Sequence, residues 1–156
     1  MKLKLVAAGT RMPGWIEEGF EDYRKRLPPQ LKLELCEIGV AHRGKNPDLA
    51  RLRKSEAESM QRALRPDDRV IALDERGERL ATADWAKALK SWMQEGRDVA
   101  FLVGGPDGLA PDMLQRAEKR WSLSPMTLPH ALVRVLVAEQ LYRAWSLLAN
   151  HPYHRA

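Results

Sequence analysis

Apolar stretches that read as strands alternate along the chain with amphipathic stretches that read as helices. Strands are expected at about residues 2–8, 31–38, 69–73, 98–103 and 121–124. Helices are expected at about residues 13–26, 47–64, 82–93, 111–119 and 130–149, with Thr82 as the N-cap of the third. Strands that are continuously apolar are typical of a parallel sheet with helices on both faces. The pattern therefore predicts one α/β domain over residues 1–156.

Composition supports a folded protein and gives a weak indication of its partner. Hydrophobic residues make up 44% of the 156 residues and charged residues 30%, which argues against disorder. The net charge is +5 and the sequence pI is about 9.6. A basic surface favours polyanions such as nucleic acid. Many small proteins are mildly basic for solubility alone, so the charge by itself does not show that the partner is nucleic acid.

Several classes of protein are disfavoured by what the sequence lacks. Cys36 is the only cysteine, so the chain can form no internal disulfide or thiolate metal cluster. Three of the four histidines lie between residues 130 and 154, but their spacing does not resemble a metal site. The N-terminal apolar run is too short for a signal peptide, and no segment is long enough to span a membrane. A cytoplasmic protein without metal is expected.

The clearest candidate for a binding site is the loop Gly104–Gly108, which follows an apolar strand and precedes a helix. Such a loop lies at the carboxyl edge of a parallel sheet, where ligands bind, although a tight turn without a ligand would look the same. The phosphate-binding and dinucleotide fingerprints are both absent. Asp107 would also repel a pyrophosphate. A ligand without phosphates, such as an adenosine with a sulfonium side chain, fits better.

A second candidate is the proline-rich segment 121–130, which is predicted to be a rigid loop. Its backbone amides and carbonyls are not all used in the hydrogen bonds of a long strand. It could present those groups to an adenine edge while Leu123, Met126 and Leu128 pack on the ring. Alternatively, its apolar residues simply join the core. The following helix has an apolar stripe wide enough for a second buried face, against the sheet or a partner. On that helix Glu139 and Arg143 are spaced as an ion pair.

The chain ends in a short polar and aromatic tail, residues 150–156, which Pro152 prevents from continuing the helix. Its aromatic, imidazole and guanidinium groups are of the kinds that stack on bases and bind phosphate. An ordinary frayed terminus is the alternative.

Several short motifs, taken in order and spacing, identify a family that the chain resembles. They are Gly104-Gly105-Pro106-Asp107-Gly108, Ser122-Leu123-Ser124, Met126-Thr127-Leu128-Pro129-His130, Arg134, Glu139 through Tyr142-Arg143-Ala144, and Tyr153-His154-Arg155. Residues 2–10 and Arg43-Gly44-Lys45 match as well. Over essentially its whole length the chain resembles the ribosomal RNA large subunit methyltransferase H family of the SPOUT class.

The resemblance implies a SPOUT-type fold, a mostly parallel sheet flanked by helices, with a trefoil knot near the C-terminus. It implies an S-adenosyl-L-methionine pocket and a homodimer in which the tail of one subunit reaches towards the pocket of the other. By analogy the cofactor contacts are Leu73, Gly104, Gly105, Leu123, Ser124, Pro125, Met126, Thr127 and Leu128. Pro125 has no N–H, so any amide contact there must come from its neighbours.

The implied reaction is methylation of N3 of a pseudouridine in large-subunit (23S) ribosomal RNA, on the assembled ribosome. That nitrogen carries a proton at neutral pH and is a poor nucleophile. We therefore hypothesise that Tyr153, His154 and Arg155 are catalytic, because they orient the base and favour its deprotonated form. The residues expected to bind RNA are Arg43, Lys45, His130, Arg134 and His151.

Two other classes of function stay open at the level of sequence. A ribosome-associated RNA-binding protein with a vestigial pocket would explain the basic surface, but not the pairing of a rigid loop with a glycine turn. A nucleotide-dependent oxidoreductase is disfavoured by the missing dinucleotide fingerprint. Binding of S-adenosyl-L-methionine or of nicotinamide would discriminate among the three.

Overall fold

The computed structural model describes residues 1–40 and 44–155. Its centre is a five-stranded sheet in which all the strand pairs are parallel, in the order β2-β1-β4-β3-β5. The strands are β1 (Lys2–Ala8), β2 (Lys32–Ile38), β3 (Arg69–Arg79), β4 (Val99–Val103) and β5 (Lys119–Ser122). The predicted α/β architecture is confirmed. The trefoil knot stays a prediction from the family resemblance.

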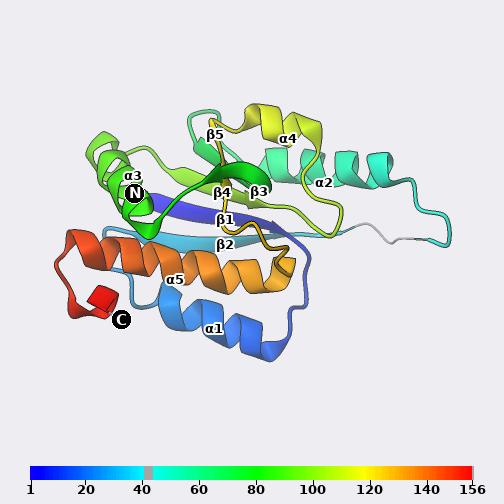
Figure 1. Cartoon of the computed structure of the whole chain (residues 1–156). Coiled ribbons are helices and arrows are strands. Elements are labelled where there is room, and N and C mark those ends of the chain that lie inside the picture. The colour runs from blue at the N-terminus through cyan, green and yellow to red at the C-terminus, as the bar shows by residue number, and fades with distance from the viewer. Residues whose placement is uncertain (41–43, 156) are drawn as a thin grey trace.

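Helices cover both faces of the sheet (Figure 1). One face carries α1 (Gly14–Arg24), α3 (Thr82–Glu95) and α5 (His130–Leu148), and the other carries α2 (Leu49–Ala63) and α4 (Pro111–Arg116). A short 3-10 helix, η1 (Pro152–Arg155), follows α5. Within the part of the chain that the structure describes, no helix combines the length and apolarity needed to cross a membrane.

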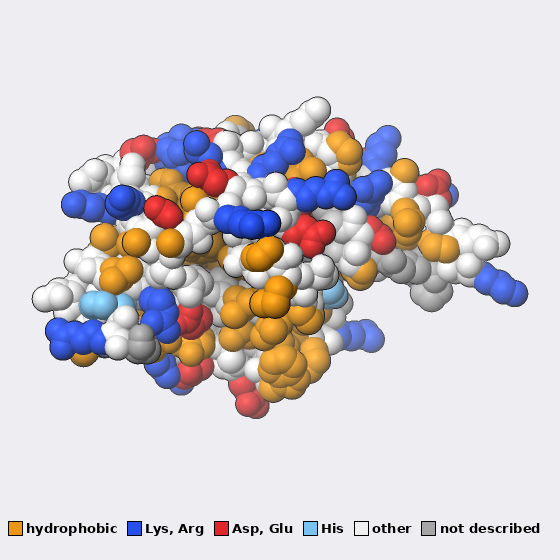
Figure 2. Space-filling view, in the orientation of Figure 1, with side chains coloured by type: hydrophobic (Ala, Val, Ile, Leu, Met, Phe, Trp, Pro, Cys, Tyr) orange, Lys and Arg blue, Asp and Glu red, His pale blue; other side chains and the backbone are white. Residues whose placement is uncertain are grey.

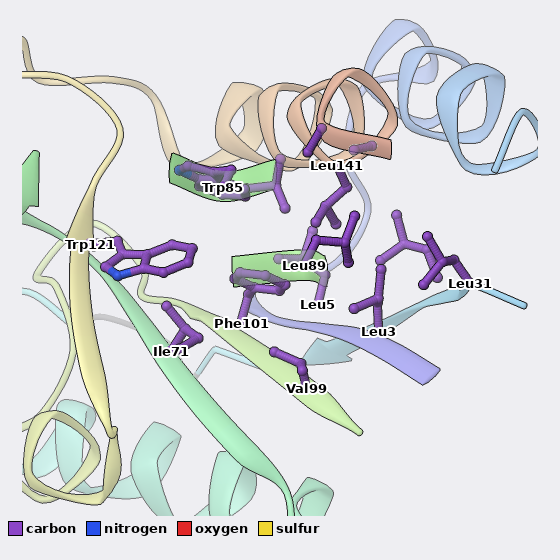
Figure 3. Packing of buried hydrophobic residues seen from close by; sticks show 14 of the residues in the cluster. Leu3, Leu5, Leu31, Ile71, Trp85, Leu89, Val99, Phe101, Trp121 and Leu141 are labelled. Atoms are coloured by element: carbon purple, nitrogen blue, oxygen red, sulfur yellow. The ribbon is translucent and has the colours of Figure 1, made fainter. Parts of the chain in front are cut away.

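The larger core cluster joins the sheet to α1, α3 and α5 (Figure 3). Alternation along β1 sends Leu3 and Leu5 into this cluster and Val6 into the smaller one beneath α2 and α4. Phe101 of β4 stacks on Trp85 of α3, with ring centroids 5.6 Å apart and an interplanar angle of 2°. Trp121 of β5 packs between Trp85 and Trp92 of the same helix. These rings fix the strand that leads into the loop 123–129.

Strand β3 is longer than the apolar pattern predicts. Its apolar part ends at Leu73, but the polar residues to Arg79 continue as a strand that pairs with β5 after a register shift between Leu73 and Glu78. Gly77 makes this possible, because a Cβ there would lie 2.6 Å from the carbonyl carbon of Arg120. Backbone pairing, invisible in a hydrophobic pattern, extends the strand.

Strand β5 spans residues 119–122 rather than 121–124, and α4 ends at Arg116 rather than near residue 119. The amide of Glu118 donates to the carbonyl of Val70, which brings the chain alongside β3 earlier than expected. At the start of α3, the N-cap is Ala81 and not Thr82. The Thr82 hydroxyl instead donates to Gln140 of α5, at 2.6 Å.

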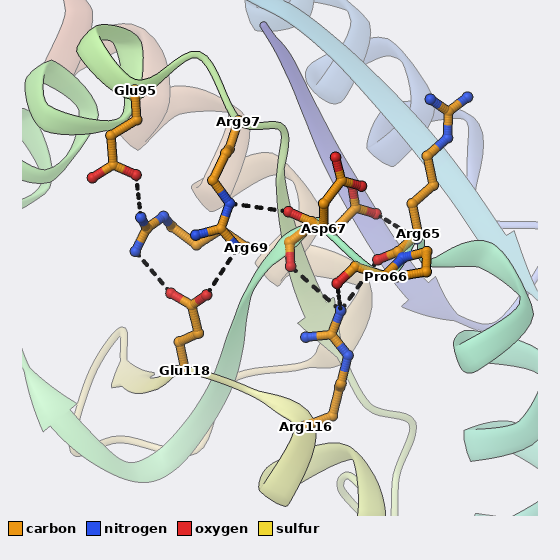
Figure 4. A network of polar contacts seen from close by, with 9 residues as sticks. Arg65, Pro66, Asp67, Arg69, Glu95, Arg97, Arg116 and Glu118 are labelled. Atoms are coloured by element: carbon orange, nitrogen blue, oxygen red, sulfur yellow. Dashed lines mark hydrogen bonds and ion pairs between the residues drawn. The ribbon is translucent and has the colours of Figure 1, made fainter.

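Ionic contacts tie down the ends of the strands on the side away from the glycine loop (Figure 4). Arg69 pairs with Glu95 and, at 2.7 Å, with Glu118, while Arg97 contacts the other oxygen of Glu118 at 3.2 Å. These groups are partly exposed, so each pair contributes little on its own. The network therefore fixes geometry more than it adds stability.

Asp68 is the buried anion of this region, with a side chain only 1% exposed. Its carboxylate accepts hydrogen bonds from Lys4 Nζ and from the amide of Arg65, both at 2.8 Å. Replacing Asp68 with alanine is expected to lower the free energy of unfolding by about 3 kcal/mol, because it leaves the partly buried Lys4 ammonium without its partner. Urea denaturation measures this. Asp67→Ala, at the exposed neighbour, is the control and should change stability by less than about 0.5 kcal/mol; equal losses in the two variants would contradict the assignment.

Candidate active site

The loop after β4 contains a tight turn, Gly105–Gly108, and the residue before the turn, Gly104, has no room for a side chain. The amide of Gly108 donates to the carbonyl of Gly105 at 2.9 Å, and Gly108 has a φ of +77°. A Cβ on Gly104 would lie 2.6 Å from the carbonyl carbon of Gly108 and 2.8 Å from the amide nitrogen of Leu109. Pro106 occupies the second position of the turn, which it favours. The absence of side chains at these glycines lets two stretches of backbone lie in contact at the carboxyl end of β4.

The segment between β5 and α5 forms the second wall, and its serines hold its shape. Ser122 Oγ donates to the carbonyl of Ser124 at 3.0 Å, and Ser124 Oγ accepts from the amide of Met126 at 2.9 Å. Thr127 Oγ1 donates to Glu75 at 3.3 Å, which connects this segment to the polar extension of β3. The segment is an ordered loop with its own hydrogen bonds, as its two prolines and hydroxyls predict.

These two loops line one pocket of about 650 Å³, a volume in the range of small-molecule sites. The structure thus brings together eight of the nine residues that the sequence assigns to the cofactor: Leu73, Gly104, Gly105, Leu123, Ser124, Met126, Thr127 and Leu128. Pro125 is exposed and does not line the pocket. Met126 lines the pocket but is 69% exposed, so most of its side chain is open to solvent.

Charged residues that the motifs did not single out also line the pocket. Asp74, Glu75 and Arg76 come from the polar part of β3, and Arg53 comes from α2. Together with Asp107 they give three carboxylates and two guanidinium groups around the site. A ligand that carries both a cation and a carboxylate would find partners there. From sequence, only Asp74–Arg76 could have been predicted at the site, because they directly follow an apolar strand.

His130 and Arg134, both assigned to RNA in the sequence, lie at different depths. His130 begins α5 and lines the pocket. Arg134 is 1% exposed, and its guanidinium donates to Glu37 at 2.7 Å and to the carbonyl of Gly9 at 2.7 Å. A guanidinium so buried and engaged has no surface to offer a phosphate, so its expected role in RNA binding does not fit this structure. It joins α5 to the loop after β1 and to the end of β2.

The other residues expected to bind RNA are placed as follows. Lys45 is exposed on the segment that leads to α2. His151 is half-buried; its Nδ1 accepts from the amide of Tyr153 at 3.2 Å, and its ring lies against Tyr142 and Trp145. Arg43 lies outside the described residues. Among those that are described, no cluster of histidine, cysteine or acidic side chains could hold a metal ion.

The tail packs away from the pocket of its own chain. Tyr153 donates its phenolic O–H to Glu139 at 3.0 Å, and Arg143 lies 4.9 Å above the Tyr153 ring while pairing with Glu139 at 2.7 Å. The predicted Glu139–Arg143 ion pair is therefore present. Glu139 lies nine residues beyond His130, about 13 Å along the helix axis. None of Tyr153, His154 and Arg155 lines the pocket.

The environment of Tyr153 predicts that its phenol ionises at an unusually high pH. Burial raises the pKa of its phenol well above the usual range, and hydrogen bonds with Tyr23 and Glu139 raise it further. Because the folded state holds this proton more tightly, the contribution to stability is complete below about pH 10 and is lost as the pH rises above the pKa of unfolded tyrosine. In an ultraviolet pH titration, Tyr153→Phe should remove the last of the three tyrosine ionisations. If instead all three tyrosines of the folded wild type ionise together near pH 10, the assignment is wrong.

Comparison with known proteins places this site in a family. The chain matches the family model described as a predicted SPOUT methyltransferase over residues 1–154. Proteins named ribosomal RNA large subunit methyltransferase H from Pseudomonas aeruginosa, Azotobacter vinelandii and Pseudomonas putida are each 52% identical to it over 155 residues. Each alignment covers 99% of this chain and 100% of the relative.

A solved structure shares the fold. The crystal structure of a probable methyltransferase from Bordetella pertussis Tohama I superposes with a TM-score of 0.58 at 16% sequence identity. The match covers 91% of this chain and 93% of that one. At this identity the likeness concerns the fold alone.

Proposed function

Because the chain belongs to the SPOUT methyltransferase family, and within it to the ribosomal RNA large subunit methyltransferase H group, we propose that it methylates N3 of a pseudouridine in large-subunit (23S) ribosomal RNA. The methyl donor in this proposal is S-adenosyl-L-methionine, and the site of action is the ribosome in the cytoplasm. One observation carries the proposal: the glycine turn after β4 and the serine-held loop before α5 line the same pocket.

The residues of the pocket fit the donor. The adenine would lie among the apolar side chains of Leu73, Leu123 and Leu128, with backbone groups of the two loops at its polar edge. The carboxylates of Asp74 and Glu75 suit a cationic ligand, and Arg53 or Arg76 suits a carboxylate. When bound, S-adenosyl-L-methionine supplies an electrophilic methyl group on a sulfonium. The protein must then position the acceptor in line with that methyl group and exclude water.

We propose further that the enzyme is a homodimer. In one chain the tail packs against Glu139 and Tyr23, away from the pocket at the first turn of α5. A second subunit can bring its own tail to this pocket. Figure 2 shows hydrophobic side chains gathered where α1 and the first half of α5 lie, and Trp15 of α1 is 62% exposed. An apolar patch of this kind is typical of a protein interface.

Basic groups supply the proposed contacts to ribosomal RNA. Many Lys and Arg side chains, interspersed with Asp and Glu, lie above the apolar patch in Figure 2, over the region of β3, β5, α2 and α4. Lys45, on the exposed segment before α2, belongs to the RNA contacts in this proposal, as does Arg43, which lies outside the described residues. Tyr153, His154 and Arg155 of the partner would hold the acceptor base at the pocket mouth.

Mass spectrometry of ribosomal RNA tests the proposed reaction. RNA from cells that lack this protein should lose one methyl group on a single pseudouridine of the large subunit, and restoring the gene should return it. A control gene carrying Gln94→Ala, an exposed position on the last turn of α3, should restore methylation fully. An unchanged methylation pattern in cells without the protein would exclude the proposed activity.

A further inference from the structure

Of the three histidines that the structure describes, His130 lines the donor pocket. It is the first residue of α5 and lines the pocket beside Leu128 and Val133. His151 and His154 lie beyond the other end of the same helix and do not line it. An imidazole on the wall of a methyl-donor pocket is a candidate for proton transfer.

The back of the His130 ring is enclosed by protein. It lies over Gly9, whose φ is +108°; a Cβ built on Gly9 would come within 3.7 Å of His130 Cε1 and 3.6 Å of Arg134 Nη2. The Nδ1 atom of His130 is buried and hydrogen-bonded to no other described residue. A neutral imidazole carries one nitrogen that donates and one that accepts. Because Nδ1 is enclosed by protein, a substrate in the pocket can approach the imidazole of His130 only at Nε2.

The charges around His130 favour its neutral form. Burial lowers its pKa below the usual value for histidine, and the Arg134 guanidinium lowers it further. Arg134 is fixed there by the carbonyls of Ala8 and Gly9 and by Glu37 of β2, which balances part of its charge. The ionisable groups on the other pocket walls are Asp74, Glu75 and Arg76 of β3, Arg53 of α2, and Asp107 of the glycine turn.

We propose that His130 is the general base that removes the N3 proton of the acceptor pseudouridine, an inference that rests on the proposed function. The N3 proton passes to Nε2 of His130, and the electron pair left on N3 forms the new bond to the methyl carbon. The bond between that carbon and sulfur breaks with its electrons on sulfur, and the imidazolium then releases its proton to water. The tail of the partner orients the base and does not receive the proton.

Two substitutions test this role, His130→Asn and His130→Gln, assayed on ribosomal substrate. Loss of a general base is expected to lower kcat by about 100-fold or more, while KM for the ribosomal substrate stays within about twofold. The wild-type rate should fall as the pH drops below the pKa of His130, because the protonated imidazole accepts no proton. In the variants this acid limb should disappear, and the residual rate should rise with pH as hydroxide or water takes over.

Two measurements without turnover separate catalysis from folding. Calorimetry should show that the His130 variants bind S-adenosyl-L-methionine within about threefold of the wild type. Nuclear magnetic resonance of the imidazole in the wild-type protein should give His130 a pKa below about 6.5, the unperturbed value. Gln94→Ala serves as the control variant and should match the wild type in every assay.

Three results would overturn the assignment: a kcat within about threefold of the wild type, a loss confined to KM for the RNA, or a His130 pKa at or above the unperturbed value. The second result would instead make His130 an RNA contact, as the sequence suggested. If the wild-type protein itself methylates no ribosomal RNA, it is the proposed function that fails, and the resonance measurement still decides the state of His130.

Discussion

Deletion of residues 151–156 is expected to lower kcat by at least about 1,000-fold while leaving donor binding intact. The deletion removes Tyr153, His154 and Arg155, which in the proposed dimer orient the acceptor base of the partner's site, and loss of such positioning can cost several powers of ten in rate. None of the three lines the donor pocket. A radiolabelled methyl-transfer assay and a calorimetric titration measure the two quantities. Unchanged turnover would remove the tail from the mechanism.

Mixed dimers reveal whether the tail acts in its own chain or in the partner. A subunit without residues 151–156 can be combined with a full-length subunit that carries Gly104→Ala in its pocket. If the tail acts in trans, each mixed dimer contains one intact site. Random mixing makes half of the dimers mixed, so two nearly inactive proteins should together restore up to about a quarter of wild-type turnover. If the tail acts in cis, the mixture should be no more active than its components.

Gly104→Ala is expected to weaken donor binding at least about tenfold and to abolish most turnover. The added methyl group would lie 2.6 Å from the carbonyl carbon of Gly108 and 2.8 Å from the amide of Leu109, both of them backbone atoms. The turn must therefore open, and overpacking of this kind costs about 1–3 kcal/mol. Calorimetry with S-adenosyl-L-methionine and thermal unfolding measure the two effects.

The matched control is Gly14→Ala, the same change at the start of α1, where a Cβ would meet no atom within 4 Å. It should bind the donor as the wild type does and unfold at the same or a slightly higher temperature, because alanine favours the helix. If the two variants lost donor affinity equally, close approach at Gly104 would not be the cause.

Much of the fold was predictable because its signals are local. The apolar runs of β1 and β4 and the helical stripe of α5 each indicate one element without reference to the rest of the chain. The second half of β3 was missed because Asp74–Arg79 is polar and becomes a strand only by pairing with β5. Backbone pairing between distant segments leaves no mark on hydrophobic periodicity.

The parts of the candidate site that depend on backbone shape were predictable from sequence. The placement of side chains that depends on burial and on contacts between distant segments was not. The glycine turn and the segment 122–128 could be found because glycine, proline and serine indicate local geometry, and the structure joins them in one pocket. Arg134 was expected to bind RNA, but Glu37 and the Gly9 carbonyl hold its guanidinium inside the protein. Arg53 was not expected at the site, since no short motif connects α2 with the carboxyl end of the sheet.

Hydrogen exchange with and without S-adenosyl-L-methionine tests most directly whether the two loops form one donor site. The account predicts that the donor slows amide exchange in residues 104–109 and in residues 123–128 together, with the same concentration dependence, while the amino ends of the strands are unaffected. Protection of only one loop, or protection elsewhere in the chain, would contradict it.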